Sequence, residues 1–278
     1  MKQLRSISAM RSWRGFLSNR LVLVPTMGAL HHGHAALIRR ARKIAGSNGS
    51  VCVSIFVNPT QFGPNEDFSA YPRPLAKDLA LCRAEGVDAV FLPKARDIYR
   101  SDASVSLQES TLSNTLCGRS RPGHFSGVLT IVAKLFFITL PTHAVFGEKD
   151  WQQLAIIRRM VRDLDIPVEI AGCPTVRETD FLAASSRNAY LTPVNRAQAP
   201  RIFAALKNAS ALSSIPAVIR SAQKSLAAIP GARIDYLEAV HAATLAPLRN
   251  RKSPGRLAVA VFLGKARLID NIPLPVLP

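Results

Sequence analysis

Residues 21–42 read LVLVPTMGALHHGHAALIRRAR, in which a short apolar run gives way to a histidine-bearing turn and then to strong helix formers. The run Leu21–Val24 ends at a proline, as expected of a strand buried on both faces of a parallel sheet. The leucine and alanine periodicity after His34 predicts a helix, so the histidines fall in or near its first turn. Ligands of such strand-turn-helix units bind at the carboxyl end of the strand.

The turn has the features of a triphosphate-binding corner. The first N–H groups of a helix have no partner within the helix and attract anions. His31 and His34 are three residues apart, on one side of the helix start, and Gly33 lets a ligand approach the backbone closely. The same histidine spacing also suits a zinc site or a plain helix cap, so these residues alone leave the ligand open.

The rest of the chain divides into an α/β part and a smaller α+β part. Residues 51–57, 89–92, 144–146 and 168–171 read as strands, and residues 75–84, 127–139 and 151–164 read as helices. After Cys173 the pattern changes to helices near 196–209 and 216–228 and strands near 232–240, 256–263 and 266–269. We therefore expect a Rossmann-like doubly wound parallel sheet in residues 1–175 and a smaller C-terminal α+β domain in residues 176–278, with an irregular proline-rich tail over 272–278.

Composition limits the class of protein. The chain has 278 residues, 48% of them hydrophobic, which is enough to bury a large core, and a formal charge of +18 that favours anionic ligands. It contains no RNA-binding aromatic signature, no zinc-finger spacing and no dense basic block, so we expect no specific nucleic-acid partner. The apolar stretch 128–146 is interrupted by Lys134, Pro141 and His143, which predicts no membrane span. The four widely spaced cysteines favour reduced thiols in the cytoplasm.

Further segments carry a specific resemblance. The set comprises six segments: 25–34 (PTMGALHHGH), 53–62 (VSIFVNPTQF), 71–73 (YPR) with Asp78, 121–125 (RPGHF), 146–154 (FGEKDWQQL) and 185–188 (SSRN). In this order, over nearly the whole chain, they resemble the pantothenate synthetase (pantoate–β-alanine ligase) family of the nucleotidylyltransferase superfamily with its HxGH motif. A basic, serine-rich segment of residues 1–20 looks like an organellar presequence, but the family has a helix in this place, so we expect a structural helix there.

The resemblance implies an enzyme that ligates pantoate and β-alanine at the expense of ATP. Pantoyl adenylate would be the intermediate, AMP and pyrophosphate would be released, and Mg²⁺ would accompany ATP. The family also implies a cytoplasmic homodimer whose smaller domain closes over the active site.

The resemblance also assigns roles to individual residues. The catalytic set would be His31, His34, Lys149 and Arg187. ATP would further contact Met27, Gly28, Gly147, Asp150, Val176, Ser185 and Ser186. Pantoate would bind Gln61, Gln153, Asn58 and Met27, and Asp78 would be the magnesium ligand. The position of Lys149 just after a predicted strand end supports its assignment, because open α/β sheets bind ligands there.

One departure and two alternatives remain. Phe181 stands where the family usually has glycine, so a positive φ there would strain the loop and slow ATP handling.

GxxxxGK[ST] and GxGxxG are both missing, which disfavours a P-loop kinase. Another HxGH nucleotidylyltransferase would keep the nucleotide on its product, and an impaired homologue would bind nucleic acid through its positive surface. Gln61 and Gln153 favour a pantoate pocket over the former, and retention of the catalytic set argues against the latter.

Overall fold

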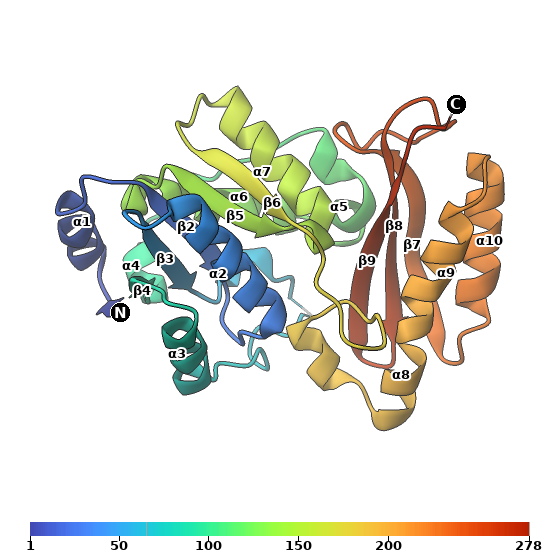
Figure 1. Cartoon of the computed structure of the whole chain (residues 1–278), viewed down its shortest axis with the longest axis horizontal. Helices are drawn as coiled ribbons and strands as arrows, with labels where there is room; N and C mark the ends of the chain where they lie inside the picture. The colour runs from blue at the N-terminus through green and yellow to red at the C-terminus, as the bar shows by residue number, and fades with distance from the viewer. Residues whose placement is uncertain (65, 278) are drawn as a thin grey trace. The chain divides into compact units, whose positions relative to one another are not determined.

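The computed structural model describes residues 1–64 and 66–277 (Figure 1). The chain forms two compact units. The first unit contains Met1–Glu109, Arg121–Glu148 and Ile156–Pro174, and the second contains Ser110–Ser120, Lys149–Ala155 and Thr175–Pro278. A boundary at 175/176 would leave residues 110–120 and 149–155 in the first domain, whereas their contacts group them with the second. Pro278, the last residue of the expected tail, lies outside the described residues.

The first unit is built on a six-stranded parallel sheet in the order β1-β4-β3-β2-β5-β6. Its strands are β1 (Lys2–Leu4), β2 (Leu21–Thr26), β3 (Ser50–Ile55), β4 (Ala89–Phe91), β5 (His143–Gly147) and β6 (Glu169–Cys173). Its helices are α1 (Ile7–Gly15), α2 (His32–Ala45), α3 (Leu75–Ala84), α4 (Ala95–Ile98) and α6 (His124–Thr139). Helix α7 (Trp151–Asp163) begins in the second unit and ends in the first. The predicted doubly wound sheet is confirmed.

Strand β2 is buried on both faces, as its apolar run predicts. Every side chain from Leu21 to Val24 is 0% exposed, and Val22 and Val24 pack in one core cluster with Ile38 and Ala41 of α2. Helix α6 also contacts β2. The strand order reverses between β2 and β5, so their carboxyl ends flank the switch point at which open α/β sheets bind ligands.

The N-terminal segment differs from the expected lone helix. It forms strand β1, which pairs in parallel with β4 at the edge of the sheet, before helix α1 begins at Ile7. Only Leu4 of the three strand residues is buried, so the segment has no alternating hydrophobic pattern that would predict a strand.

The second unit is built on an antiparallel sheet in the order β7-β8-β9. Its strands are β7 (Ala232–His241), β8 (Gly255–Leu263) and β9 (Ala266–Leu274), and its helices are α5 (Leu116–Ser120), α8 (Pro193–Gln198), α9 (Pro200–Ser210) and α10 (Ile215–Ala227). Helices α9 and α10 pack on each other and on β9 and β7, with Ile202, Leu206 and Val218 in the shared core. The predicted small α+β unit is therefore present.

Two boundaries in this unit were predicted wrongly. The single helix expected over 196–209 is divided into α8 and α9, because Pro200 has no N–H to continue a helix but fits the first position of a new one. The tail expected from Ile272 is strand up to Leu274, with Pro273 opposite Arg256. Strand β9 lies at the sheet edge, where a residue without an N–H is tolerated.

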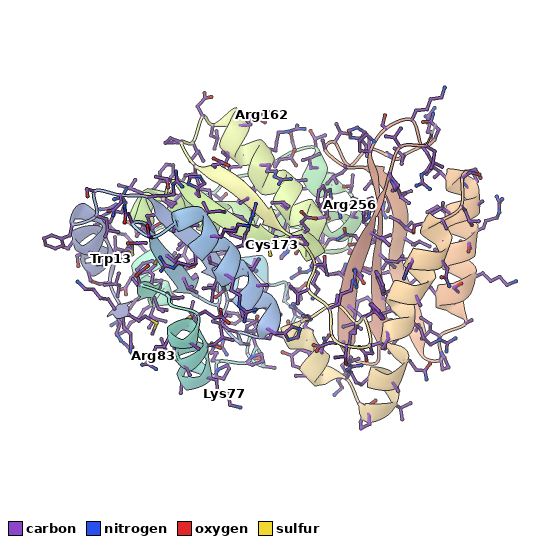
Figure 2. The ribbon with its side chains drawn as sticks, viewed as in Figure 1. Trp13, Lys77, Arg83, Arg162, Cys173 and Arg256 are labelled. Atoms are coloured by element: carbon purple, nitrogen blue, oxygen red, sulfur yellow. The ribbon has the colours of Figure 1, made fainter. Side chains whose placement is uncertain are left out.

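The positive charge is distributed over separate elements. Lys77 and Arg83 on α3 and Arg162 on α7, all labelled in Figure 2, are exposed to solvent. Over residues 1–64 and 66–277, every helix is too short or too polar to cross a membrane.

Candidate active site

The HxGH segment forms the start of helix α2 in the first unit. His31 is the N-cap residue, and its Nδ1 accepts a hydrogen bond from the Gly33 N–H at 3.1 Å. The Nδ1 of His34 accepts from the His31 N–H at 3.3 Å, and the two ring centroids are 4.2 Å apart. A neutral imidazole that accepts at Nδ1 carries its proton on Nε2. The histidines therefore cap the helix and also have an N–H donor on the opposite side of each ring.

The turn before the histidines is held by Asp78 of α3. Its two carboxylate oxygens accept from the Ala29 N–H at 3.0 Å and from the Leu30 N–H at 2.7 Å, and the residue is 1% exposed. Burial raises the pKa of Asp78, although these two hydrogen bonds oppose the shift. Gly28 has φ +81°, and a Cβ there would lie 3.0 Å from the Asp78 carboxylate, so the turn needs glycine.

Three of the residues predicted to bind pantoate lie together in the first unit. Asn58 is 1% exposed, and its Nδ2 donates to the Gln61 Oε1 at 3.1 Å and to the Gly127 carbonyl at 3.1 Å. The Gln61 Nε2 lies 3.1 Å from the Met27 Sδ. Gln61 ends the 3₁₀ helix η1 (Pro59–Gln61), which follows β3. Its side chain is thus oriented from both sides by neighbouring groups.

The RPGHF segment, which had no predicted role, fixes the backbone of Gln61. Arg121 makes a two-pronged ion pair with Glu66, with both N–O distances 2.6 Å, and its Nη1 lies 2.9 Å from the His124 Nε2. The His124 Nδ1 lies 2.8 Å from the Gln61 carbonyl oxygen and the Arg121 Nη2 lies 3.3 Å from it. Burial tends to raise the pKa of Glu66, but the hydrogen bond and charge of Arg121 outweigh burial and keep this pKa low.

Lys149 lies in the second unit, within the 3₁₀ helix η3 (Glu148–Asp150) that follows β5. Its Nζ donates to the Ala184 carbonyl at 2.8 Å, and its own carbonyl accepts from the Asn271 Nδ2 at 3.0 Å. Burial lowers the pKa of Lys149 to about 8, and the charges of Asp270 and Asp150 oppose this shift. The ammonium is therefore poorly solvated and loses its proton more readily than that of a fully solvated lysine.

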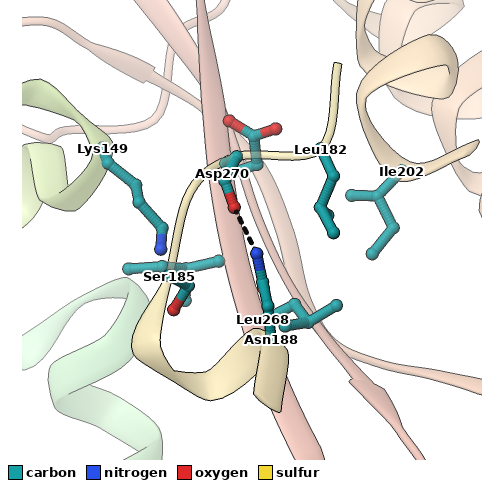
Figure 3. Close-up of a pocket in the computed structure, with 9 residues that line it drawn as sticks. Lys149, Leu182, Ser185, Asn188, Ile202, Leu268 and Asp270 are labelled. Atoms are coloured by element: carbon teal, nitrogen blue, oxygen red, sulfur yellow. Dashed lines mark hydrogen bonds between the residues drawn. The ribbon is translucent and has the colours of Figure 1, made fainter. Parts of the chain in front are cut away.

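A small pocket in the second unit joins Lys149 to the SSRN segment (Figure 3). Its lining residues are Lys149, Leu182, Ala183, Ser185, Asn188, Ile202, Leu268, Ile269 and Asp270. Ser185 caps the 3₁₀ helix η4 (Ser186–Tyr190) by accepting from the Arg187 N–H at 3.3 Å. Asn188 donates to the Ala183 carbonyl, as the dashed line in Figure 3 marks, while its buried Oδ1 has no hydrogen-bond partner among the described residues.

The two consecutive glutamines of FGEKDWQQL have different environments. Gln152 is 3% exposed, donates to the carbonyls of Leu112 and Thr115 and accepts from the Cys117 N–H, so it is committed to the structure. Asp150 accepts from the Gln153 N–H at 3.3 Å and so caps the start of α7.

The remaining predicted ATP residues lie at the end of β5 and in the segment that follows β6. Gly147 ends β5 at the switch point of the first unit. In the second unit, the Val176 carbonyl accepts from the Ala184 N–H at 2.9 Å and holds the loop that leads to Ser185. Asp270 and Asn271 were not predicted, because β9 carries no recognised motif.

Phe181 has a positive φ, which is the condition under which the sequence predicts strain at this position. Its φ is +70°, and its ring is 57% exposed. The ring stacks on Phe203 of α9 with centroids 5.9 Å apart, and the ammonium of Lys207 lies 5.9 Å from its centre. Phenylalanine therefore compensates part of the backbone strain through contacts that glycine would lack. The predicted effect on ATP handling stays a prediction.

The residues present are compatible with magnesium carried by ATP. Over residues 1–64 and 66–277, no group of three or more His, Cys, Asp or Glu side chains could hold a metal ion. Magnesium on a triphosphate keeps several water ligands and needs few protein carboxylates. Asp78 as its ligand stays a prediction, and both of its oxygens already accept backbone hydrogen bonds.

Comparison with known proteins completes the description. The family model described as pantoate-beta-alanine ligase matches residues 2–273. A pantothenate synthetase of Akkermansia muciniphila is 53% identical over 91% of this chain and 92% of its own length, and one of Thermosipho melanesiensis is 48% identical over 98% and 99%.

Solved structures agree with the sequence matches. A pantothenate synthetase from Thermus thermophilus has a TM-score of 0.92 at 44% identity and covers 99% of this chain and 100% of its own. A Francisella tularensis pantoate-beta-alanine ligase, complexed with beta-gamma ATP and beta-alanine, has a TM-score of 0.82 at 37% identity and covers 98% and 97%. With its HxGH helix start and its SSRN segment beside Lys149, this chain belongs to the pantoate-beta-alanine ligase family.

Proposed function

We propose that this protein joins pantoate to β-alanine in an ATP-dependent ligation with pantoyl adenylate as intermediate, releasing AMP and pyrophosphate. The observation that carries the proposal is the family match over residues 2–273, which contains every residue assigned to the reaction. The cytoplasmic location, the homodimer and the closure of the smaller domain are parts of the same proposal.

In the first step, a carboxylate oxygen of pantoate attacks the α-phosphorus of ATP, and the bond from that phosphorus to the bridging oxygen of pyrophosphate breaks. Catalysis then consists of alignment and of stabilising the charge that grows on the phosphate oxygens. We assign this stabilisation to the Lys149 ammonium and to the Nε2–H donors of His31 and His34. Ser185, Ser186 and Arg187 would bind the β- and γ-phosphates.

In the second step, the neutral amine of β-alanine attacks the acyl carbon of pantoyl adenylate; an amide bond forms, the bond from the acyl carbon to the phosphate oxygen of AMP breaks, and the nitrogen releases one proton to the solvent. The activated acyl group is supplied by the substrate, so no side chain has to act as a nucleophile. Met27, Gly28, Gly147, Asp150 and Val176 are assigned to the nucleotide. Backbone approach at the two glycines and an acceptor at Asp150 suit adenosine.

Pantoate is assigned to Gln61, Gln153, Asn58 and Met27. Amide groups can orient its hydroxyls and carboxylate while apolar walls surround its branched carbon frame. The Gln61 amide supports this role, since Asn58 and Met27 fix its side chain and Arg121 and His124 fix its carbonyl. Magnesium bound to ATP would neutralise phosphate charge, with Asp78 as the proposed protein ligand.

The test is mass-spectrometric detection of pantothenate and AMP from purified protein with ATP, magnesium, pantoate and β-alanine. Omission of each component in turn must abolish the product. A nucleotide-bearing end product that persists in the presence of β-alanine, with no pantothenate formed, would instead indicate a nucleotidylyltransferase of another specificity. Salt-dependent retention of nucleic acid without pantothenate formation would indicate an impaired homologue.

A further inference from the structure

We propose that Asp270 on β9 is a positioning residue for Lys149, whose ammonium it stabilises in the pocket that the two residues line together. The proposal rests on the proposed function, since it extends the role of Lys149 in adenylation. It concerns residues of the second unit only, and none of the sequence motifs contains Asp270.

Asp270 is placed beside Lys149 by the sheet. It lines the same small pocket as Lys149, Ser185 and Asn188 (Figure 3), and its side chain is 4% exposed. A carboxylate buried to this degree has to be paired or heavily hydrogen-bonded. Arg177 provides the pair, with Nη1 2.7 Å from one carboxylate oxygen and Nη2 2.9 Å from the other, and the Asn271 N–H donates to the second oxygen at 2.8 Å.

Arg177 is itself held rigidly. Its guanidinium lies over the ring of Phe203, 3.7 Å from the ring centre, and its Nη1 also donates to the Phe181 carbonyl at 3.1 Å. A planar guanidinium that is stacked on a ring and bonded through two nitrogens to a carboxylate has little remaining rotational freedom. The orientation of the Asp270 carboxylate is therefore fixed by the fold of this unit.

The neighbouring residue on β9 holds the backbone of Lys149. The Asn271 Nδ2 donates to the Lys149 carbonyl at 3.0 Å, and the Asn271 Oδ1 accepts from Arg256 at 3.1 Å. Arg256, labelled in Figure 2, lies 3.6 Å from the ring centre of Trp151. Two consecutive residues of one strand thus act on the same lysine, one through its backbone and the other through its charge.

The charged groups around Lys149 explain how the Asp270 carboxylate affects the protonation of the lysine. Burial disfavours the ammonium most strongly, Asp270 and then Asp150 favour it, and Arg187 and Arg177 disfavour it. Replacing Asp270 by asparagine removes a favourable charge and also leaves the Arg177 charge without its partner. Both changes lower the charged fraction of Lys149, so the loss of activity should be largest at alkaline pH.

The experiment compares the wild-type protein with Asp270→Asn in pantoate-dependent exchange of labelled pyrophosphate into ATP, from about pH 6 to about pH 10. In the pH–rate profile, we expect the midpoint of the alkaline limb to lie about one pH unit lower in the variant than in the wild type. Well above the wild-type midpoint, the variant should then be about tenfold slower. The KM for pantoate should change little, because Asp270 is not assigned to that substrate. Unchanged position of the alkaline limb would overturn the proposal.

Two further variants separate charge from folding. Asp270→Glu keeps the carboxylate, so its alkaline limb should stay near that of the wild type even if its rate is lower. Asp235→Asn breaks the comparable ion pair of Asp235 with Arg267 on β7 and β9, whose side chains are 15% and 17% exposed. This control should leave the alkaline limb in place, and an equal shift in it would refute a specific role for Asp270.

A readout that needs no catalysis distinguishes this inference from the proposed function. The rate at which an amine-selective reagent labels the Lys149 Nζ is followed against pH by peptide mass spectrometry, and its midpoint should be lower in Asp270→Asn. A shifted midpoint in a protein that makes no pantothenate would reject the proposed function but keep the effect of Asp270 on the lysine. Full activity with an unshifted midpoint would reject the role of Asp270 alone.

Discussion

The histidine pair in the first unit and the lysine in the second are held in place by different kinds of contact. His31 and His34 are positioned by hydrogen bonds within four consecutive residues at one helix start. Lys149 is positioned by the Ala184 carbonyl and the Asn271 side chain, which are 35 and 122 residues away in sequence. The first arrangement is complete within one helix start, whereas the second needs the loop that contains Ala184 and strand β9 of the antiparallel sheet.

The two arrangements also differ in their electrostatics. The histidines lie at a helix N-terminus, where the positive end of the helix dipole favours an anion. The lysine carries a full charge in a poorly solvated place, so its state depends on which charged neighbours the fold brings close. We therefore expect changes near Lys149 to act on activity and its pH dependence, and changes near His31 to act on activity and helix stability.

Of the variants that test this difference between the lysine and the histidine pair, Lys149→Ala should have the largest effect. Removing a charge that stabilises the transferred phosphate should lower the rate of pantoate-dependent ATP–pyrophosphate exchange about a thousandfold. In the wild type, kcat/KM for ATP should fall as the pH rises through about 8, because the Lys149 ammonium is lost there. Lys224→Ala on the exposed face of α10 is the matched control, and equal activity in both variants would remove Lys149 from the mechanism.

His31 allows capping to be separated from phosphate binding. His31→Ala should lose about 1 kcal/mol of stability with the cap and about 10- to 100-fold in exchange rate with the imidazole donor. His31→Asn should keep the stability, since asparagine is a good N-cap residue, but lose the rate as well. Denaturant unfolding and the exchange assay check the pair. Full activity in His31→Asn would mean that the residue is only a cap.

Asp78→Asn distinguishes a loop support from a metal ligand. The carboxamide would present a donor to a backbone N–H that now has an acceptor, so we expect a loss of about 1–3 kcal/mol in stability and only a several-fold loss of rate. The half-saturating magnesium concentration, measured at constant ATP, should not change if Asp78 only holds the turn. A marked rise in that concentration would support the predicted magnesium ligand, and Asp102→Asn, on an exposed loop, is the control.

Position 181 should give the smallest effect. Phe181→Ala keeps the positive φ of a non-glycine residue and loses the ring stack, whereas Phe181→Gly relieves the backbone. We expect the glycine variant to be more stable than the alanine variant by about 1 kcal/mol in denaturant unfolding. We also expect it to handle ATP better than the wild type, as a lower KM for ATP. Equal kinetics in the three proteins would show that this loop does not limit ATP binding.

The sequence alone was sufficient for the features that depend on short stretches of chain. The apolar run Leu21–Val24 predicted a doubly buried strand, and helix α3 was predicted with its observed bounds. The family motifs predicted the HxGH helix start and the groups assigned to pantoate, of which Met27, Asn58 and Gln61 lie together in the first unit. Strain at Phe181 was predicted on the condition of a positive φ, and the structure has that φ.

The predicted strand boundaries are wrong where pairing with a neighbouring strand outweighs the local sequence preference. Strand β1 has three residues and one buried side chain, and it is held as a strand by its pairing with β4. Strand β9 continues through Pro273 because the register with β8 holds the edge residue in place. Neither segment has a periodic pattern that could be recognised from the sequence.

The sequence by itself thus determined the family, the parallel sheet and the helix start at the histidines, because short motifs, apolar runs and helical periodicity can each be recognised within a single segment of chain. Only the tertiary structure determined that Asp78 holds the turn, that Arg121 and His124 fix Gln61, and that Asp270 and Asn271 lie beside Lys149. Burial and charge depend on distances in space, and the residues that set them for Lys149 belong to segments that only the folded sheet brings together.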